Sequence, residues 1–266
     1  MKIVCLIKFV PDVDNFSYDY EKNVLVRENM KLILNPDDAC ALAFALGVKG
    51  KRADTAVEIV TMAPINVLPL VEDLLRRNAD RGTIISDRSF AGSDTYATSK
   101  IIARYMENTG YDMILTGTHS LDGDTSHVPS QVAELLKLEQ LSNIVRIYDE
   151  SLGPGSETVV VEADTDKTIS KFEIALPCML SIGKDSKYKL PFVKYKDLEL
   201  DVSDRVSVIN NESLGFSEAE VGLRGSLTKV NRTFARKLQK REKTVVHNDE
   251  EGIGTVYRFL KSNGFV

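Results

Sequence analysis

The residues best placed to bind a ligand lie together in residues 113–136 of the sequence. An apolar run there gives way to small and polar residues, and a helix with apolar periodicity follows. Gly117 and Gly123 let the backbone approach a ligand, and the first amides of a helix have no intrahelical acceptor. A strand, a tight turn and a helix start in this order predict an anion site. The carboxylates of Asp122 and Asp124 argue against a simple phosphate cradle, although carboxylates can bind the ribose hydroxyl groups of a nucleotide.

Other motifs for catalysis or nucleotide binding are missing from the sequence. The three histidines, His119, His127 and His247, stand in no G-x-S-x-G or H-E-x-x-H context, and we expect no catalytic residue or metal ligand among them. His119 and His127 flank the candidate turn, where each either contacts the ligand or serves as a loop or capping residue. No G-x-G-x-x-G follows a strand and no G-x-x-x-x-G-K-[ST] occurs, so a nucleotide would be held by several dispersed loops.

The elements that would position these residues alternate between strand and helix. Helical segments of about a dozen residues separate five apolar, strand-like segments, at residues 2–8, 56–61, 82–86, 113–116 and 143–148. This alternation predicts a doubly wound parallel sheet, which is a Rossmann-like three-layer α/β/α fold. Asn35 can cap the first helix, which we expect to end at Gly47 or Gly50. Ligands bind such sheets at the carboxyl ends of the strands, where we expect five loops to meet, at residues 9–14, 35–38, 62–64, 87–95 and 117–125.

The second half of the chain loses this alternation. Residues 157–163 and 168–174 alternate like an antiparallel pair, which predicts a small hairpin region, and residues 176–182 return to apolar strand character. Apolar residues are then sparse until a final helix, which we expect at residues 252–263. A tail over residues 191–266 has too few apolar residues to fold alone. We therefore expect it to lie on another surface, of this chain or of a partner.

Composition excludes several classes of protein. A formal net charge of −5 and an isoelectric point near 5.4 argue against nucleic-acid binding. The basic segment 224–243 is therefore interpreted as a solvated arm or a surface for an acidic partner. No apolar run approaches the roughly 20 residues of a membrane span, and the first apolar run is too short for a signal peptide. Cys5, Cys40 and Cys178 fit neither a disulfide framework nor a metal knuckle, so we expect a cytoplasmic protein.

Six motifs, in order along the chain, resemble the β subunit of electron transfer flavoprotein over nearly the whole length. They are residues 2–12 (KIVCLIKFVPD), 35–42 (NPDDACAL), 78–83 (NADRGT), Gly117 with 121–125 (LDGDT), 176–177 (LP) and 221–230 (VGLRGSLTKV). The resemblance implies an α/β domain of the adenine-nucleotide-binding type over residues 1–190. It also implies an extended C-terminal arm over residues 191–266 that packs on the α subunit.

The resemblance and the loop pattern together give one set of cofactor-binding candidates. The resemblance implies nucleotide contacts at Leu6, Asn35, Pro36, Asp37, Asp38, Met62, Gly117, Thr118, His119, Ser120, Leu121, Asp122, Gly123, Asp124, Thr125, Ser126, His127 and Val128, with backbone amides of residues 123–128 on a diphosphate. The helix start at Asp94 and Thr95 is a second candidate anion site, and Lys8 could face an anion. Asp37 and Asp38 could instead be turn and cap residues. Leu176 matches a loop that docks into partner dehydrogenases, or it is a core strand residue.

One segment distinguishes two types within this family. Residues 87–98 (DRSFAGSDTYAT) resemble a loop of the bifurcating type, and Gly123 points the same way. The bifurcating type implies FAD on this subunit and NAD(H) as donor or acceptor. It also implies an α subunit with its own FAD, a dehydrogenase of the acyl-CoA or 2-hydroxy-acid type, and ferredoxin or flavodoxin. The alternatives are a non-bifurcating β subunit that holds a structural AMP, and a nucleotide sensor of the universal-stress type.

The chain departs from the family pattern at His127, at Pro129 and Ser130 and at Leu227, and the acidic-glycine turn before the docking loop is weak here, at residues 164–167. The family usually has Gln where His127 stands, Gly-Pro where Pro129 and Ser130 stand, and Pro where Leu227 stands. The first two departures lie at the start of the phosphate-facing helix. The contacts to a diphosphate could therefore differ in this chain.

Overall fold

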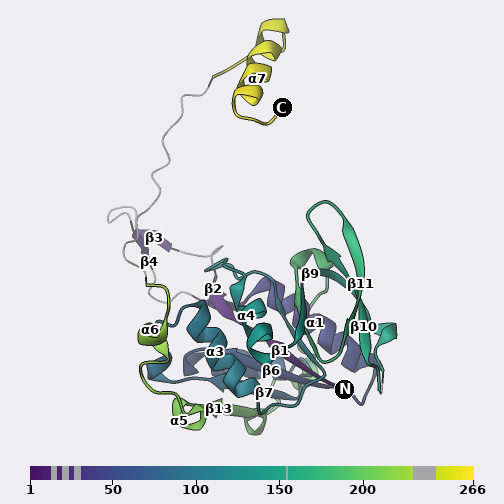
Figure 1. Ribbon diagram of the computed structural model, residues 1–266, viewed down its shortest axis with the longest axis vertical. Helices are drawn as coiled ribbons and strands as arrows, with labels where there is room; N and C mark the ends of the chain where they lie inside the picture. Colours follow the sequence, from purple (N-terminus) through teal and green to yellow (C-terminus); the bar gives the residue numbers. More distant parts are fainter. Residues whose placement is uncertain (13–16, 20–23, 27–30, 154, 230–243) are drawn as a thin grey trace. The chain divides into compact units, whose positions relative to one another are not determined.

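The computed structural model describes residues 1–12, 17–19, 24–26, 31–153, 155–229 and 244–266 (Figure 1). The chain forms two compact units, residues 1–229 and residues 230–266, and each is considered by itself. Residues 13 and 14 of the first expected ligand loop lie outside the described residues, as do residues 230–243 of the basic segment.

A large sheet forms the centre of the first unit and, among the described residues, contains nine strands in the order β11-β10-β9-β12-β8-β1-β6-β7-β13. Neighbours from β9 to β13 pair in parallel, whereas β10 is antiparallel to both β9 and β11. The strands are β1 (Lys2–Leu6), β6 (Ala56–Met62), β7 (Arg81–Ile85), β8 (Met113–Gly117), β9 (Glu139–Tyr148), β10 (Thr158–Asp164), β11 (Ile169–Ala175), β12 (Cys178–Ile182) and β13 (Val206–Ile209). The antiparallel pair β10–β11 confirms the predicted hairpin region.

Helices cover both faces of this sheet (Figure 1). Successive side chains of a strand point to opposite faces, so the buried residues 3–6 of β1 contribute to two cores. Ile3 and Cys5 pack on one face with α1 (Pro36–Lys51) and α2 (Leu68–Leu75). Val4 and Leu6 pack on the other face with α3 (Thr95–Met106) and α4 (His127–Leu136). The predicted three-layer α/β fold is therefore confirmed.

Shorter elements complete the described part of the chain. Two small antiparallel pairs are β2 (Phe9–Pro11) with β5 (Leu32–Leu34) and β3 (Ser17–Asp19) with β4 (Val24–Val26). Short helices are α5 (Asn211–Leu214) and α6 (Gly222–Gly225), and the second unit contains α7 (Glu250–Ser262). Single turns of 3₁₀ helix occur at Ile65–Val67, Arg88–Phe90, Asp149–Ser151, Lys184–Ser186, Tyr195–Asp197 and Ser203–Arg205.

Residues 191–229, which we expected to belong to the arm, lie in the first unit. Strand β13 pairs in parallel with β7 and forms the last strand of the sheet on that side. Val202 is fully buried and joins the core on the α1 face. The part of the expected arm that forms a separate unit therefore begins at residue 230.

The predicted end of the first helix was wrong, because α1 continues through Gly47 and Gly50 to Lys51. Both glycines are exposed, and a glycine in a helix costs only about 1 kcal/mol relative to alanine. The neighbouring Leu46 and Val48 are 6% and 1% exposed. Burial of two such side chains contributes about 3 kcal/mol or more, which outweighs the glycine penalty.

Candidate functional site

Two of the five expected ligand loops, residues 35–38 and 117–125, meet where the strand order of the sheet reverses. Strand β1 has β6 on one side and β8 on the other, so the chain crosses from one half of the sheet to the other between β7 and β8. Doubly wound sheets bind ligands outside the carboxyl ends of strands at such a point. Leu6, Met62 and Gly117 are the last residues of β1, β6 and β8, as the predicted site requires. The residues that follow β1 and β8 therefore lie at this switch point.

Asp38 links the ends of β1 and β8. Its Oδ2 accepts a hydrogen bond from the amide of Lys8 (2.8 Å), and its Oδ1 accepts one from the amide of Gly117 (2.6 Å). Burial of this side chain raises the pKa of Asp38 to about 7, although these two hydrogen bonds lower it. A side chain at residue 117 would collide with this carboxylate, because an added Cβ would lie 2.5 Å from Asp38 Oδ1. Asp38 thus holds the ends of β1 and β8 together through these two hydrogen bonds.

Asn35 and Asp37 hold the loop that follows β8. Asn35 stands at the N-cap of α1 with Pro36 next to it, but its side chain makes no capping hydrogen bond. Its Nδ2 instead donates to the carbonyl of His119 (2.6 Å), and its Oδ1 accepts from the amide of Leu121 (3.2 Å). Asp37 Oδ2 accepts from the amide of His119 (3.1 Å). The expected side-chain cap at Asn35 was wrong, because the loop offers this buried amide two partners.

Lys8 forms an ion pair with Asp122 across the same edge of the sheet. Its Nζ lies 2.7 Å from both carboxylate oxygens. Partial burial opposes ionisation of Asp122, but the hydrogen bond and charge of Lys8 hold the pKa of this carboxyl below its usual range. Asp122, one of the two acidic residues in the candidate turn, therefore has Lys8 as its partner. This pairing also means that Lys8 already faces an anion from this chain.

The start of α4 presents backbone amides without acceptors. The amides of Gly123 and Asp124 bond within the loop, to Asp122 Oδ1 (2.8 Å) and the Ser120 carbonyl (2.9 Å). In the described part of the chain, the amides of residues 125–128 have no hydrogen-bond acceptor. Unpaired amides at a helix start favour an anion. Of the predicted diphosphate contacts at residues 123–128, the last four are thus open in the structure.

The remaining residues of the predicted set differ in accessibility. Thr118 is 5% exposed, and its amide donates to the carbonyl of Ile182 on β12 (3.1 Å). Thr125 and His127 are exposed, whereas Val128 packs against the core on the α3 face. A ligand can therefore reach the loop residues more readily than Thr118 or Val128.

Asp94 and Thr95 begin α3, but the carboxylate of Asp94 is occupied by this chain. Its Oδ1 accepts from the amide of Ala97 (2.9 Å), so this side chain caps the helix. Its Oδ2 accepts from the amide and the hydroxyl of Thr228, both at 2.8 Å. The amide of Asp94 donates to Ser226 Oγ (2.8 Å). Asp94 thus fastens the segment that leads toward residue 230, a role that the local sequence did not indicate.

Replacing Asp94 by alanine is expected to destabilise the first unit by about 1–2 kcal/mol, because it removes the cap of α3. It should also increase hydrogen exchange at Thr228, whose amide loses its acceptor. Urea unfolding and amide exchange would measure the two effects. The matched variant Thr228→Val removes only the hydroxyl and keeps both the Asp94–Ala97 cap and the acceptor of the residue 228 amide, so its stability loss should be smaller and exchange at residue 228 should stay near the wild-type rate. Equal stability losses in both variants would contradict this division.

Leu176 lies in the turn between β11 and β12 and not at the carboxyl edge described above. Its amide donates to the carbonyl of Glu157 (2.8 Å), and its partly buried side chain packs against the core on the α1 face. The following Pro177 is exposed. The docking role of Leu176 stays a prediction.

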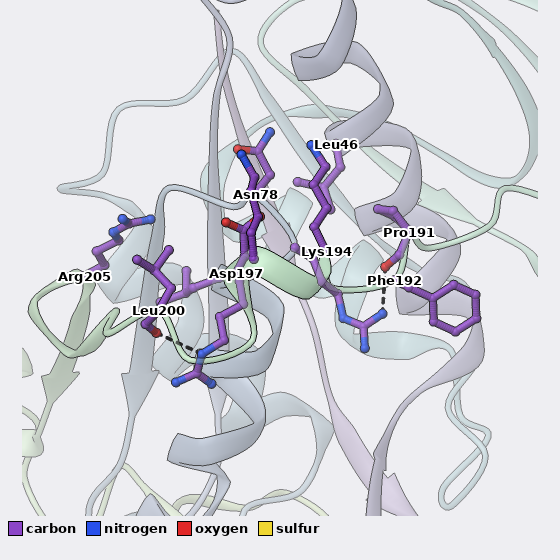
Figure 2. Close-up of a pocket in the computed structure, with 12 residues that line it drawn as sticks. Leu46, Asn78, Pro191, Phe192, Lys194, Asp197, Leu200 and Arg205 are labelled. Atoms are coloured by element: carbon purple, nitrogen blue, oxygen red, sulfur yellow. Dashed lines mark hydrogen bonds between the residues drawn. The ribbon is translucent and has the colours of Figure 1, made fainter.

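A cavity of about 460 Å³ was not indicated by the sequence, and Figure 2 draws the residues that line it. Arg76 and Arg77, which precede β7, form one wall, so this cavity lies at the amino edge of the sheet. Arg76 Nε donates to the carbonyl of Leu200 (3.0 Å), and Arg77 Nη1 donates to that of Pro191 (2.7 Å). These arginines hold residues 191–200 against the end of α2.

Neither a metal site nor a membrane span is found in the described ranges. No group of three or more His, Cys, Asp or Glu side chains there could hold a metal ion. No helix there is long and apolar enough to cross a membrane. Cys5, Cys40 and Cys178 are buried free thiols, and burial raises the pKa of Cys178 to about 12.

Comparison with known proteins gives one consistent family. The model of the electron transfer flavoprotein domain matches residues 22–191. The caffeyl-CoA reductase-Etf complex subunit CarD of Acetobacterium woodii is 32% identical over 239 residues, 88% of each chain. The electron transfer flavoprotein subunit beta of Thermoanaerobacterium thermosaccharolyticum is 29% identical over 98% of each chain. The acryloyl-CoA reductase electron transfer subunit gamma of Anaerotignum propionicum is 30% identical over 88% of each chain. This chain therefore belongs to the electron transfer flavoprotein family and is of the β-subunit type.

Proposed function

We propose that this chain binds FAD at the carboxyl ends of β1 and β8 and is the NADH-using subunit of a bifurcating electron transfer flavoprotein. The chemistry supplied by bound FAD is acceptance of a hydride from NADH and release of single electrons, one toward the α-subunit FAD and one toward ferredoxin or flavodoxin. The observation that carries the proposal is the set of unpaired amides at residues 125–128. They follow the end of β8, where Asp38 accepts a hydrogen bond from the amide of Gly117. The bifurcating type is supported by the sequence of residues 87–98.

The residues at this edge fit an adenine dinucleotide in two respects. The amides of residues 125–128 supply donors for phosphate oxygens. Gly117 leaves room for Asp37 and Asp38 at the start of α1, and these two residues hold the end of β8 and the loop that follows it. The role of these residues is to bind and orient the cofactor, because the redox chemistry belongs to the cofactor itself.

We propose an α-type subunit and a dehydrogenase that acts on CoA esters as protein partners. The names of two relatives associate those relatives with caffeyl-CoA and acryloyl-CoA reductases. A 2-hydroxy-acid dehydrogenase is the alternative partner, and Leu176 is the proposed docking residue. The arm residues are proposed to pack on the α subunit, because α7 exposes Ile253 (61%) and Tyr257 (56%). Free cysteines support a cytoplasmic location.

A non-bifurcating β subunit with a structural AMP is the second candidate, since AMP also offers a phosphate to the same amides. Purification of the complex with its α-type partner, followed by acid extraction and flavin quantification, separates the two. The first candidate predicts about two flavins per heterodimer, and the second predicts about one flavin with AMP in the extract. A ratio near one, with no reduction of the complex by NADH, would overturn the bifurcating assignment.

A further inference from the structure

Two residues at the start of α4 have the chemistry of helix caps but do not cap. Ser126 occupies the N-cap position, yet its side chain makes no capping hydrogen bond. Asp124 lies two residues earlier and is equally suited to accept helix amides. An N-cap oxygen normally accepts the second or third helical amide, and here the third residue is Pro129, which has no N–H. The amide of Val128 therefore remains available to a cap, but no cap takes it.

Both side chains are drawn instead to one nitrogen atom of His119. Asp124 Oδ1 lies 2.9 Å from His119 Nδ1, and Ser126 Oγ lies 2.8 Å from the same atom. An N–H at Nδ1 donates to the carboxylate, which leaves Nε2 pointing away from this contact. Asp124 and Ser126 both have left-handed backbones, with φ of 48° and 54°. Such backbones are uncommon for residues other than glycine and need support from their surroundings.

The ring of His119 can hold these side chains because its own backbone is anchored on both sides. Its amide donates to Asp37 Oδ2, and its carbonyl accepts from Asn35 Nδ2. Asn35 and Asp37 are 1% and 7% exposed, so the anchors belong to the rigid start of α1. The ring itself is 56% exposed and reaches outward from this anchored backbone.

We propose that His119 is a positioning residue that keeps Asp124 and Ser126 off the start of α4, so that its amides stay free for the phosphates of the nucleotide. The inference rests on the proposed function and adds no new site. Without the His119 tether, the carboxylate or the hydroxyl would turn to the amides of residues 126–128 and compete with phosphate. His119 thereby sets the affinity for the phosphate part of the ligand and leaves adenosine recognition unchanged.

The test measures binding of ADP and of adenosine to the complex of the full-length chain with its α-type partner, after removal of bound nucleotide. His119→Ala is expected to weaken ADP binding roughly tenfold. This loss of affinity corresponds to the free energy of about one charge-assisted hydrogen bond. Adenosine, which has no phosphate, should bind as it does to the wild type. His119→Asn places a donor at the position of Nδ1 and should restore ADP affinity. The exposed His247 supplies the matched control, His247→Ala, which should change neither affinity.

The outcomes separate this inference from the proposed function. If the wild-type complex binds neither ADP nor FAD, the proposed function fails. If the wild type binds ADP and His119→Ala binds it equally well, only the role of His119 fails. A parallel loss of ADP and adenosine binding in His119→Ala would show a collapsed loop and would also overturn the positioning role. Thermal unfolding supplies a second readout, because newly formed caps on α4 should leave the stability of His119→Ala equal to that of the wild type or above it.

Discussion

Replacing Gly117 by alanine is expected to destabilise the protein by about 3 kcal/mol and to abolish nucleotide binding. The added Cβ would lie 2.5 Å from Asp38 Oδ1 and 2.6 Å from both Asp37 Cβ and Asp38 N. These atoms cannot move aside cheaply, because Asp38 is held by the amides of Lys8 and Gly117 on its two oxygens. Relief requires the start of α1 to move away from β8, and this would also displace the loop that Asn35 and Asp37 anchor.

Urea unfolding would measure the stability of Gly117→Ala, and nucleotide content after purification would measure binding. Gly47→Ala is the matched control, because the same methyl group there meets no atom within 4 Å on an exposed helix face. That control should gain about 0.5–1 kcal/mol from the better helix propensity of alanine. If Gly117→Ala unfolds at the same urea concentration as the wild type, the close approach of α1 to β8 is not a constraint on this fold.

The layers of the fold could be predicted because they depend on local patterns. The continuous apolar run Ile3, Val4, Cys5 and Leu6 gives one strand two buried faces, and its side chains belong to both cores of the structure. The same reasoning placed the ligand loops, since parallel strands end at a common edge. The end of α1 was predicted too early. The exposed glycines lower the stability of the helix by less than the burial of the neighbouring side chains raises it, so the helix continues past them.

The partners of individual polar residues could not be predicted, because they lie far away in sequence. Asn35 has the local pattern of a cap, but its side chain donates to the carbonyl of His119, which lies 84 residues later in the sequence. Asp94 does cap α3, yet its second oxygen binds Thr228 at a separation of 134 residues. A short polar side chain satisfies whichever donors the fold brings near it, and this depends on packing rather than on neighbours in sequence. The candidate site was therefore predicted as a set of loops, without its hydrogen bonds.

Replacing Asp38 by asparagine is expected to cost about 1–3 kcal/mol at neutral pH. Each carboxylate oxygen of Asp38 accepts one backbone amide, from Lys8 on one strand and from Gly117 on the other. Asparagine has one carbonyl oxygen and one NH₂ group, so one of these amides would face a donor instead of an acceptor. The residue is 4% exposed, and water cannot replace the lost acceptor. Urea unfolding at a series of pH values would measure the difference between this variant and the wild type.

The pH dependence of that difference tests which force dominates at Asp38. Burial raises the pKa of Asp38 from its usual 3.8 to about 7 in the folded chain. Between these values the folded state holds a proton that the unfolded state has lost, so stability falls as pH rises. The advantage of the wild type over Asp38→Asn should therefore be greatest near pH 4 and shrink toward pH 7, with a slope of at most about 1.4 kcal/mol per pH unit. Gly47→Ala, which adds no titratable group, should show a constant difference from the wild type. A wild-type advantage that grows with pH would mean that the two amide hydrogen bonds favour the carboxylate more strongly than burial disfavours it, and Asp38 would then be charged throughout the physiological range.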